Sequence, residues 1–371
     1  MAPDTADIAA AIGLARDREL PLAVRGGTMH SKEDVMDITG RARDLFRGAE
    51  RQAAADFGIE MSERILPIGE PVGQARVIES GSGRPVLFVH GGGGLANHWF
   101  PLMAHLDGYR LIAVDRPGCG LTDGFDYSRA ASLRQHAVTF LTHVVDAAGL
   151  GAVDIVANSM GALWSLWLAA DRPERVRSLA LLGCPALVAG TSAPLAMRIV
   201  SRRGLGWLLE RPASDRSIRQ AMARFGHTED IADALPPSFV QASVLGANLP
   251  AASASWRSML WRCLRLRGAR PDAVPGSELR AVKVSPLAIW GDHDPFDDQD
   301  AARRFAASVN ASLVFAGRGH LPWLDQPQQI AALIRDHLAS TAEHCSPISP
   351  VCLQVPHQLD LGPQRTASTF A

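Results

Sequence analysis

Apolar runs of strand length alternate, from residue 63 onward, with segments in which apolar positions recur at helical spacing. The strand patterns cover residues 63–68, 74–80, 85–90, 111–115, 152–157, 178–183, 285–291 and 311–316. The helical patterns cover residues 130–149, 159–170, 298–308 and 327–339. Strands that alternate with helices are typical of a mostly parallel sheet. We therefore predict an α/β fold, with an eight-stranded type of sheet and helices on both of its faces.

The alternation stops between residues 185 and 280. This stretch has helical patches rich in Arg, Leu and Trp, separated by the sequences RPAS, LPPS and LPAAS. It predicts a helical lid subdomain over 185–280, inserted into a core of residues 63–184 and 281–340. Residues 1–62 are helical only in patches and are expected to form a partly disordered N-terminal extension. Residues 341–371 are rich in Ser, Pro and Gln without periodicity, which is typical of a disordered tail.

The balance of charge narrows the choice of partners. The chain has 371 residues, of which 47 % are hydrophobic, and 37 Lys and Arg residues nearly match 38 Asp and Glu residues. No excess charge draws such a chain to nucleic acid or to an anionic membrane, so we expect a small-molecule substrate. The sequence shows neither a secretory signal nor an apolar run of about 18 residues, and a cytoplasmic location is expected. The oligomeric state is left open.

The cysteines predict neither a metal site nor a disulfide framework. The five residues are Cys119, Cys184, Cys263, Cys345 and Cys352. Their number is odd, their spacing is wide, and they have no CxxC pairs or His partners at zinc spacing. A reducing compartment fits this usage best.

A serine candidate for chemistry lies in the sequence ANSMG, residues 157–161. A nucleophilic serine has to be raised out of the chain on a tight turn between a strand and a helix, with small neighbours around it. Here a predicted strand leads in, Ser159 lies at the turn, and Gly161 leaves room for close packing. The positive end of the next helix dipole points at the same place. Serine is also a good helix cap, so the pentapeptide alone leaves both roles open.

Two later loops carry the partners that a nucleophilic serine needs, which are a base and an acid that orients it. GDHDPF and GRGHLPW each follow a predicted strand, so both loops reach the same sheet edge as Ser159. His320 is favoured as the base over His293. Asp294 is favoured as the acid over Asp292 because it lies farther around its turn. The order Ser, Asp, His, each after a strand, predicts a catalytic triad.

The glycine run HGGGG, residues 90–94, offers backbone without side chains next to a substrate. A tetrahedral oxyanion needs two N–H donors, and we predict those of Gly92 and Met160. His90 ends a buried strand and is expected to be structural. The run has no Walker lysine and no GxGxxG arrangement on a suitable βαβ unit, so no nucleotide cofactor is predicted.

Together these motifs resemble the α/β-hydrolase fold family over roughly residues 63–340. HGGGG, DRPGCGLTD, ANSMGA, WGDHDPF and GHLPWLDQP occur in the family's order. The resemblance implies a helical lid, acyl transfer to water and no cofactor. Ser159 implies the serine-nucleophile branch, because the similar epoxide hydrolases and haloalkane dehalogenases use a carboxylate.

The substrate class has two enzymatic interpretations. Asn158 and the SMG sequence look like those of the C–C hydrolases that act on ring-cleavage products, vinylogous diketones. Those enzymes usually have GHW, where this chain has Leu321 after His320. We therefore expect a serine hydrolase of a small carboxylic ester or lactone, with C–C bond hydrolysis as the alternative. A third interpretation, a non-catalytic protein that binds a small ligand, fits less well because such proteins often lack a triad member.

Aromatic side chains near these motifs are candidates for a substrate pocket. His98, Trp99 and Trp323 are expected to line it, and Trp256 and Trp261 of the lid are further candidates. Tryptophans at helical spacing are more often core residues, so packing is the alternative role.

Residues 7–31 carry a second, shorter resemblance, to the opening of the flavin-binding domain of FAD-linked oxidases. In those proteins a loop similar to VRGGGHS holds the flavin. Here Thr28 and Met29 interrupt the glycine run, and the rest of that large domain is missing. We therefore expect no flavin, and interpret the segment either as a remnant of a fusion or as the result of a wrongly assigned start of the sequence.

Overall fold

A computed structural model of the chain describes residues 23–24, 27–28, 32–188, 193–202, 212–228 and 230–343. The predicted tail beyond residue 343 and most of the flavin-like segment lie outside these described residues.

The protein is built on an eight-stranded sheet with the order β12-β11-β8-β7-β5-β6-β4-β3. Its strands are β3 (Ser62–Gly69), β4 (Gly73–Ser80), β5 (Arg84–Val89), β6 (Tyr109–Val114), β7 (Val153–Asn158), β8 (Val176–Leu182), β11 (Leu287–Trp290) and β12 (Ser312–Phe315). Strand β4 is antiparallel to β3 and β6, and every other neighbouring pair in this sheet is parallel. The predicted α/β fold with a mostly parallel sheet is confirmed. Two-residue strands form two small hairpins, β1 (Ala23–Val24) with β2 (Gly27–Thr28) and β9 (Leu264–Arg265) with β10 (Gly268–Ala269).

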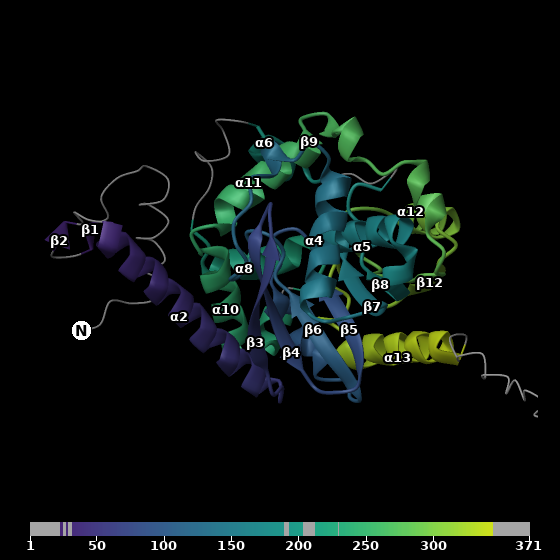
Figure 1. The fold of residues 1–371 in the computed structure, drawn as a ribbon, viewed down its shortest axis with the longest axis horizontal. Coiled ribbons are helices and arrows are strands. Elements are labelled where there is room, and N and C mark those ends of the chain that lie inside the picture. The colour runs from purple at the N-terminus through teal and green to yellow at the C-terminus, as the bar shows by residue number, and fades with distance from the viewer. Residues whose placement is uncertain are drawn as a thin grey trace, which may run out of the picture.

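Helices cover both faces of this sheet (Figure 1). The helices of the described residues are α2 (Lys32–Asp56), α3 (Phe100–Met103), α4 (Leu133–Ala147), α5 (Ser159–Asp171), α6 (Leu195–Val200), α8 (Asp215–Arg224), α9 (Ile231–Ala234), α10 (Pro237–Ala247), α11 (Ala252–Cys263), α12 (Gln299–Ser308) and α13 (Pro327–Glu343). Side chains alternate between the two faces of a strand. In β5, Leu87 and Val89 pack with α4 and α5, whereas Val86 and Phe88 pack with α3 and α13. Residues 86–89 of this central strand are therefore all apolar, as expected where a strand is covered on both faces.

The helices α6 and α8–α11 lie between β8 and β11, and we call them the inserted helices. Residues 264–286, which follow α11, contain the small β9–β10 hairpin and two short 3-10 turns, Pro271–Ala273 and Ser277–Ala281. Helix α11 reaches the C-terminal ends of the parallel strands, because Trp256 and Met259 contact the loop that follows β5. The inserted helices thus cover the end of the sheet at which the parallel strands finish.

Helix α2 runs beside the inserted helix α10 at the edge of the fold (Figure 1). Phe46 on α2 is fully buried in a small apolar cluster with Leu95 and with Leu245 and Leu249 of the α10 region. A Cβ built on Gly246 would lie 2.5 Å from Leu95 and 2.9 Å from the Phe46 ring, so this glycine permits the close approach. The N-terminal helix therefore packs on the inserted helices and on the loop after β5 at once.

No helix among the described residues is both long enough and apolar enough to cross a membrane.

Candidate functional site

The turn between β7 and α5 holds Ser159 in a strained conformation. Its φ is +52°, a region that side chains other than glycine rarely adopt. A Cβ built on Gly161 would lie 2.2 Å from the carbonyl oxygen of Val89, so only glycine lets α5 start this close to β5. A Cβ on Gly91 would lie 3.0 Å from Cβ of Ser159. The glycines at positions 91 and 161 therefore bring the serine turn against the loop after β5.

The structure brings His320 and Asp294 together at this edge. His320 Nδ1 and Asp294 Oδ2 are 2.8 Å apart, and both residues are buried. Neither His320 Nε2 nor the Ser159 hydroxyl has a hydrogen-bond partner among the described residues, and neither atom is sealed from solvent. A neutral histidine whose Nδ1 donates to a carboxylate has its Nε2 lone pair available as a base.

Asp294 is held ionised by its surroundings. Burial raises the pKa of its carboxyl group, but the charge and hydrogen bond of His320 and two backbone N–H groups outweigh burial, so the pKa lies below its usual value. The backbone donors are Cys184, 2.8 Å from Oδ2, and Phe296, 3.0 Å from Oδ1. The carboxylate has three hydrogen bonds and is therefore fixed in orientation.

The competing candidates on the same loop point elsewhere. Asp292 and His293 are exposed, and both of their backbone N–H groups bond to the loop that carries His320. His293 donates its backbone N–H to the carbonyl oxygen of Arg318 at 2.6 Å. Its main chain, and not its imidazole, therefore contacts the histidine loop. The geometry thus pairs His320 with Asp294 and not with Asp292.

Asn158 is a connection that the sequence did not reveal. Its side-chain amide donates to the carbonyl oxygens of Leu182, at 2.7 Å, and of His320, at 3.0 Å. A Cβ on Gly91 would lie 2.6 Å from its Oδ1. The residue that precedes Ser159 therefore joins the serine turn to β8 and to the backbone of the histidine loop. The hydrogen-bond partners of this amide can be predicted only if the register of β7 on β8 is known, and a single sequence does not give that register.

The glycine-rich loop lies between Ser159 and helix α11. A Cβ on Gly92 would lie 2.8 Å from the Trp256 ring and 3.1 Å from Met259, so the loop backbone is covered by these two apolar side chains. Met160 is buried in the first turn of α5. The two residues predicted to supply oxyanion donors thus belong to segments that meet at Gly91 and Ser159.

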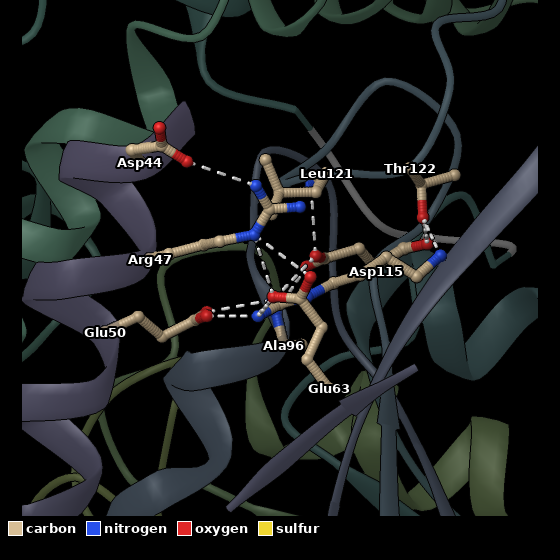
Figure 2. A network of polar contacts seen from close by, with 9 residues as sticks. Asp44, Arg47, Glu50, Glu63, Ala96, Asp115, Leu121 and Thr122 are labelled. Atoms are coloured by element: carbon tan, nitrogen blue, oxygen red, sulfur yellow. Dashed lines mark hydrogen bonds and ion pairs between the residues drawn. The ribbon is translucent and has the colours of Figure 1, made fainter. Parts of the chain in front are cut away.

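A buried network of charges supports the base of this loop (Figure 2). Asp115, at the end of β6, accepts hydrogen bonds from the backbone N–H groups of Ala96, at 2.8 Å, and Leu121, at 3.2 Å. Its Oδ2 also lies 3.0 Å from Nη1 of Arg76, which is fully buried and pairs with Glu50 of α2. The start of the short helix Ala96–Trp99 is therefore tied through β4 to the N-terminal helix.

His90 has a structural environment, as its position at the end of a buried strand predicts. Its Nε2 accepts the backbone N–H of Arg116 at 2.9 Å, and its Nδ1 lies 2.8 Å from the carbonyl oxygen of Gly91. Burial and the charge of Arg116 hold its pKa well below the usual value. The neutral ring thus bridges the ends of β5 and β6.

The three residues predicted to line a pocket pack together, with both tryptophans buried and His98 half-buried. The rings of Trp99 and Trp323 stack at 4.3 Å, and Trp323 Nε1 donates to the carbonyl oxygen of His98 at 2.9 Å. Both tryptophans are almost fully buried and belong to the hydrophobic core on the face of the sheet that α3 and α13 cover. Their packing supports a core role, and their contact with a substrate is still only a prediction. Trp256, on the other hand, covers Gly92 directly.

Among the described residues there is no group of three or more His, Cys, Asp and Glu side chains placed to hold a metal ion. Cys119, Cys184 and Cys263 are free thiols, and Cys345 and Cys352 lie outside the described residues.

Several known proteins are similar to this chain over most of its length. Over 349 residues the chain is 26 % identical to the dihydrolipoyllysine-residue acetyltransferase component of an acetoin cleaving system from Cupriavidus necator, covering 91 % of this chain and 84 % of that protein. It is 28 % identical to a 2-hydroxy-6-oxononadienedioate/2-hydroxy-6-oxononatrienedioate hydrolase from Burkholderia vietnamiensis, covering 70 % of this chain and 89 % of that one. The solved structure of carboxylesterase CesB from Bacillus subtilis shares the fold at 20 % identity, with a TM-score of 0.59, covering 81 % of this chain and 99 % of that chain.

The model of the alpha/beta hydrolase family matches residues 86–333, which include the serine turn and the loops of Asp294 and His320. Because this match spans more than half of the sequence, the chain belongs to the alpha/beta hydrolase family.

Proposed function

We propose that this hydrolase cleaves a small carboxylic ester or lactone through an acyl-enzyme. Ser159 is the nucleophile, His320 the base and Asp294 the group that orients it. The observation that carries the proposal is the buried pair of His320 and Asp294, 2.8 Å apart, on the sheet edge at which Ser159 is held at φ +52°. A strained serine on this kind of turn presents its hydroxyl away from the strand and helix that flank it.

The reaction follows from the roles of these three groups. His320 Nε2 takes the hydroxyl proton as Ser159 attacks the carbonyl carbon, and Asp294 stabilises the imidazolium that forms. The N–H groups of Met160 and Gly92 hold the oxyanion, since donors fixed in place need no reorganisation when charge develops. His320 then protonates the leaving alcohol. Water, deprotonated by His320, attacks the acyl group and releases the acid.

Cleavage of a C–C bond in a vinylogous diketone is the second candidate. Asn158 and the SMG sequence favour it, as does the 28 % identity to a hydrolase named for 2-hydroxy-6-oxononadienedioate. The same Ser159 and His320 would serve, with ketonisation of the substrate before the bond breaks. Leu321, in the position where such enzymes usually have tryptophan, favours the ester reading.

One panel of substrates separates the two. Purified protein and its Ser159→Ala variant are assayed on nitrophenyl esters of increasing acyl length, on lactones and on ring-cleavage diketones. We expect turnover of an ester or lactone by the wild type and none by Ser159→Ala. Turnover of the diketones alone would establish the second candidate. Ester hydrolysis that persists in Ser159→Ala would disprove both.

A further inference from the structure

A second histidine-aspartate pair lies beside the histidine loop. His227, in the turn after α8, places Nδ1 2.7 Å from Oδ2 of Asp325, and its side chain is fully buried. Its Nε2 accepts the backbone N–H of Leu321 at 3.3 Å. This pair belongs neither to the proposed triad nor to the sheet, and it joins an inserted helix to the residue that follows His320.

The hydrogen bonds of His227 indicate which of its two ring nitrogens carries the hydrogen. Since Nε2 accepts a backbone N–H, it carries no proton, and Nδ1 must then be the protonated nitrogen of a neutral ring. Nδ1 therefore donates to Asp325, whose Oδ2 also accepts the backbone N–H of Arg318 at 3.3 Å. One ring thus holds the histidine loop at two points, through Leu321 directly and through Asp325.

The turn that carries His227 also contacts His320 itself. The backbone N–H of His320 donates to the carbonyl oxygen of Phe225 at 2.8 Å. Gly319 packs so closely that a Cβ there would lie 2.5 Å from that oxygen and 2.7 Å from the His227 ring. The residues at 319, 320 and 321 are therefore all held by the turn after α8.

We propose that His227 is a positioning residue, which fixes the loop of His320 through the Leu321 hydrogen bond and so couples the inserted helices to the base. This inference rests on the proposed function, in which His320 transfers the proton. Residues on either side of His320 lie against His227, so loss of the bond changes the direction of the imidazole rather than the substrate contacts. A misplacement of about 1 Å in a reacting group can lower the rate by roughly 100-fold.

Two variants each keep a different half of the ring's hydrogen bonding. In His227→Gln, the side-chain carbonyl reaches the position of Nε2 and accepts the Leu321 N–H. In His227→Asn, the side-chain amide reaches the position of Nδ1 and donates to Asp325, but the Leu321 N–H has no acceptor. We expect His227→Asn to lower kcat by roughly 10- to 100-fold with little change in KM. His227→Gln should recover kcat to within about threefold of the wild type.

The experiment measures kcat and KM on the ester that the wild type turns over best, with the melting temperature of each variant. Arg219→Gln is the matched control, because it breaks exposed ion pairs with Asp215 and Asp233 around α8 without touching the histidine loop. It should keep the wild-type kcat. Equal kcat values for the Gln and Asn variants, whether both high or both low, would overturn the proposal.

Two further measurements keep this test decisive. If His227→Asn does not fold, His227→Leu replaces it, because its side chain fills the site but accepts no hydrogen bond from the Leu321 N–H; we expect kcat roughly 10-fold or more below that of His227→Gln, and equal values overturn the proposal. His320→Ala separates this inference from the proposed function. If that variant keeps its activity, the proposed function fails. If it is inactive while the Gln and Asn variants match each other, only the role of His227 is rejected.

Discussion

The side-chain amide of Asn158 donates a hydrogen bond to the carbonyl oxygen of His320 at 3.0 Å, so the residue before the proposed nucleophile holds the backbone of the proposed base. The same nitrogen donates to Leu182 at 2.7 Å, and Asn158 is almost fully buried. Both hydrogens of one amide are therefore used on carbonyl oxygens, and no other side chain of this size and shape donates twice from that point.

Asn158→Asp should be strongly destabilising. The change replaces a donor by an oxygen that faces two carbonyl oxygens in a buried place, and burying an unsatisfied polar group costs about 1–3 kcal/mol or more. We expect the free energy of unfolding to fall by at least that amount and kcat to fall with it, measured by denaturant titration and by ester hydrolysis. Asn310→Asp is the matched control, since Asn310 is exposed and its amide donates only to Ser285. Equal losses of stability in the two variants would contradict the assigned role of Asn158.

Asp294→Asn should remove most of the activity while leaving the protein folded. The amide keeps the shape of the carboxylate but can present its NH₂ group to His320, which then holds the wrong tautomer, and it cannot stabilise the imidazolium. In a serine protease the corresponding change lowers kcat by about 10⁴-fold. We expect a loss of roughly 10³- to 10⁴-fold here. Asp292→Asn, on the exposed side of the same turn, should stay within about twofold, and the reverse ranking in steady-state assays would assign the acid to Asp292.

Much of the fold could be predicted because each buried parallel strand is a short, nearly continuous apolar run in the sequence. The buried runs at 85–90, 111–115 and 152–157 are apolar at all but one position each, since both faces of these strands are covered, and the structure has strands there within a few residues. The antiparallel pairing of β4 could not be predicted. It depends on which neighbour a strand finds, and the pattern of QARVIES does not specify that.

In the candidate site, only the residues that directly follow the ends of strands could be predicted from the sequence. Ser159, Asp294 and His320 each follow a strand, so a parallel sheet brings them to one edge. His227 and Asn158 were missed as connecting residues because their partners lie 98 and 162 positions away, at Asp325 and His320. The contact of His227 depends on how the inserted helices dock, and that of Asn158 depends on the register of β7 on β8. No local pattern encodes either arrangement.

Gly161→Ala should disrupt the serine turn. The new Cβ would lie 2.2 Å from the carbonyl oxygen of Val89 and 2.5 Å from that of His90, and both belong to backbone that cannot rotate away. Overpacking of this kind typically costs about 1–3 kcal/mol and occasionally more. We expect a lower melting temperature and a lower kcat. Gly151→Ala is the control, because nothing lies within 4 Å of a Cβ at that position. If both alanine variants melt alike, the close packing of α5 on β5 is not what requires glycine at position 161.

Glu50 should make the stability of the protein depend on pH. Burial, together with the charges of Asp115 and Glu63, raises the pKa of its carboxyl group from 4.5 to about 7, although Arg76 acts in the opposite direction. The folded protein therefore keeps a proton that the unfolded chain releases. The stability from that proton is fully present below pH 4.5 and is lost as the pH rises through about 7.

Glu50→Gln removes this titration, because an amide binds no proton in this range. Relative to the variant, the wild type should lose free energy of unfolding between pH 4.5 and about 7, by no more than about 3 kcal/mol at 1.36 kcal/mol per pKa unit. Urea titrations of both proteins at half-unit intervals of pH measure the difference. Glu60→Gln, at an exposed position, should follow the wild-type curve. Parallel curves for the wild type and Glu50→Gln would show instead that Glu50 is ionised throughout and that Arg76 outweighs both burial and the neighbouring carboxylates.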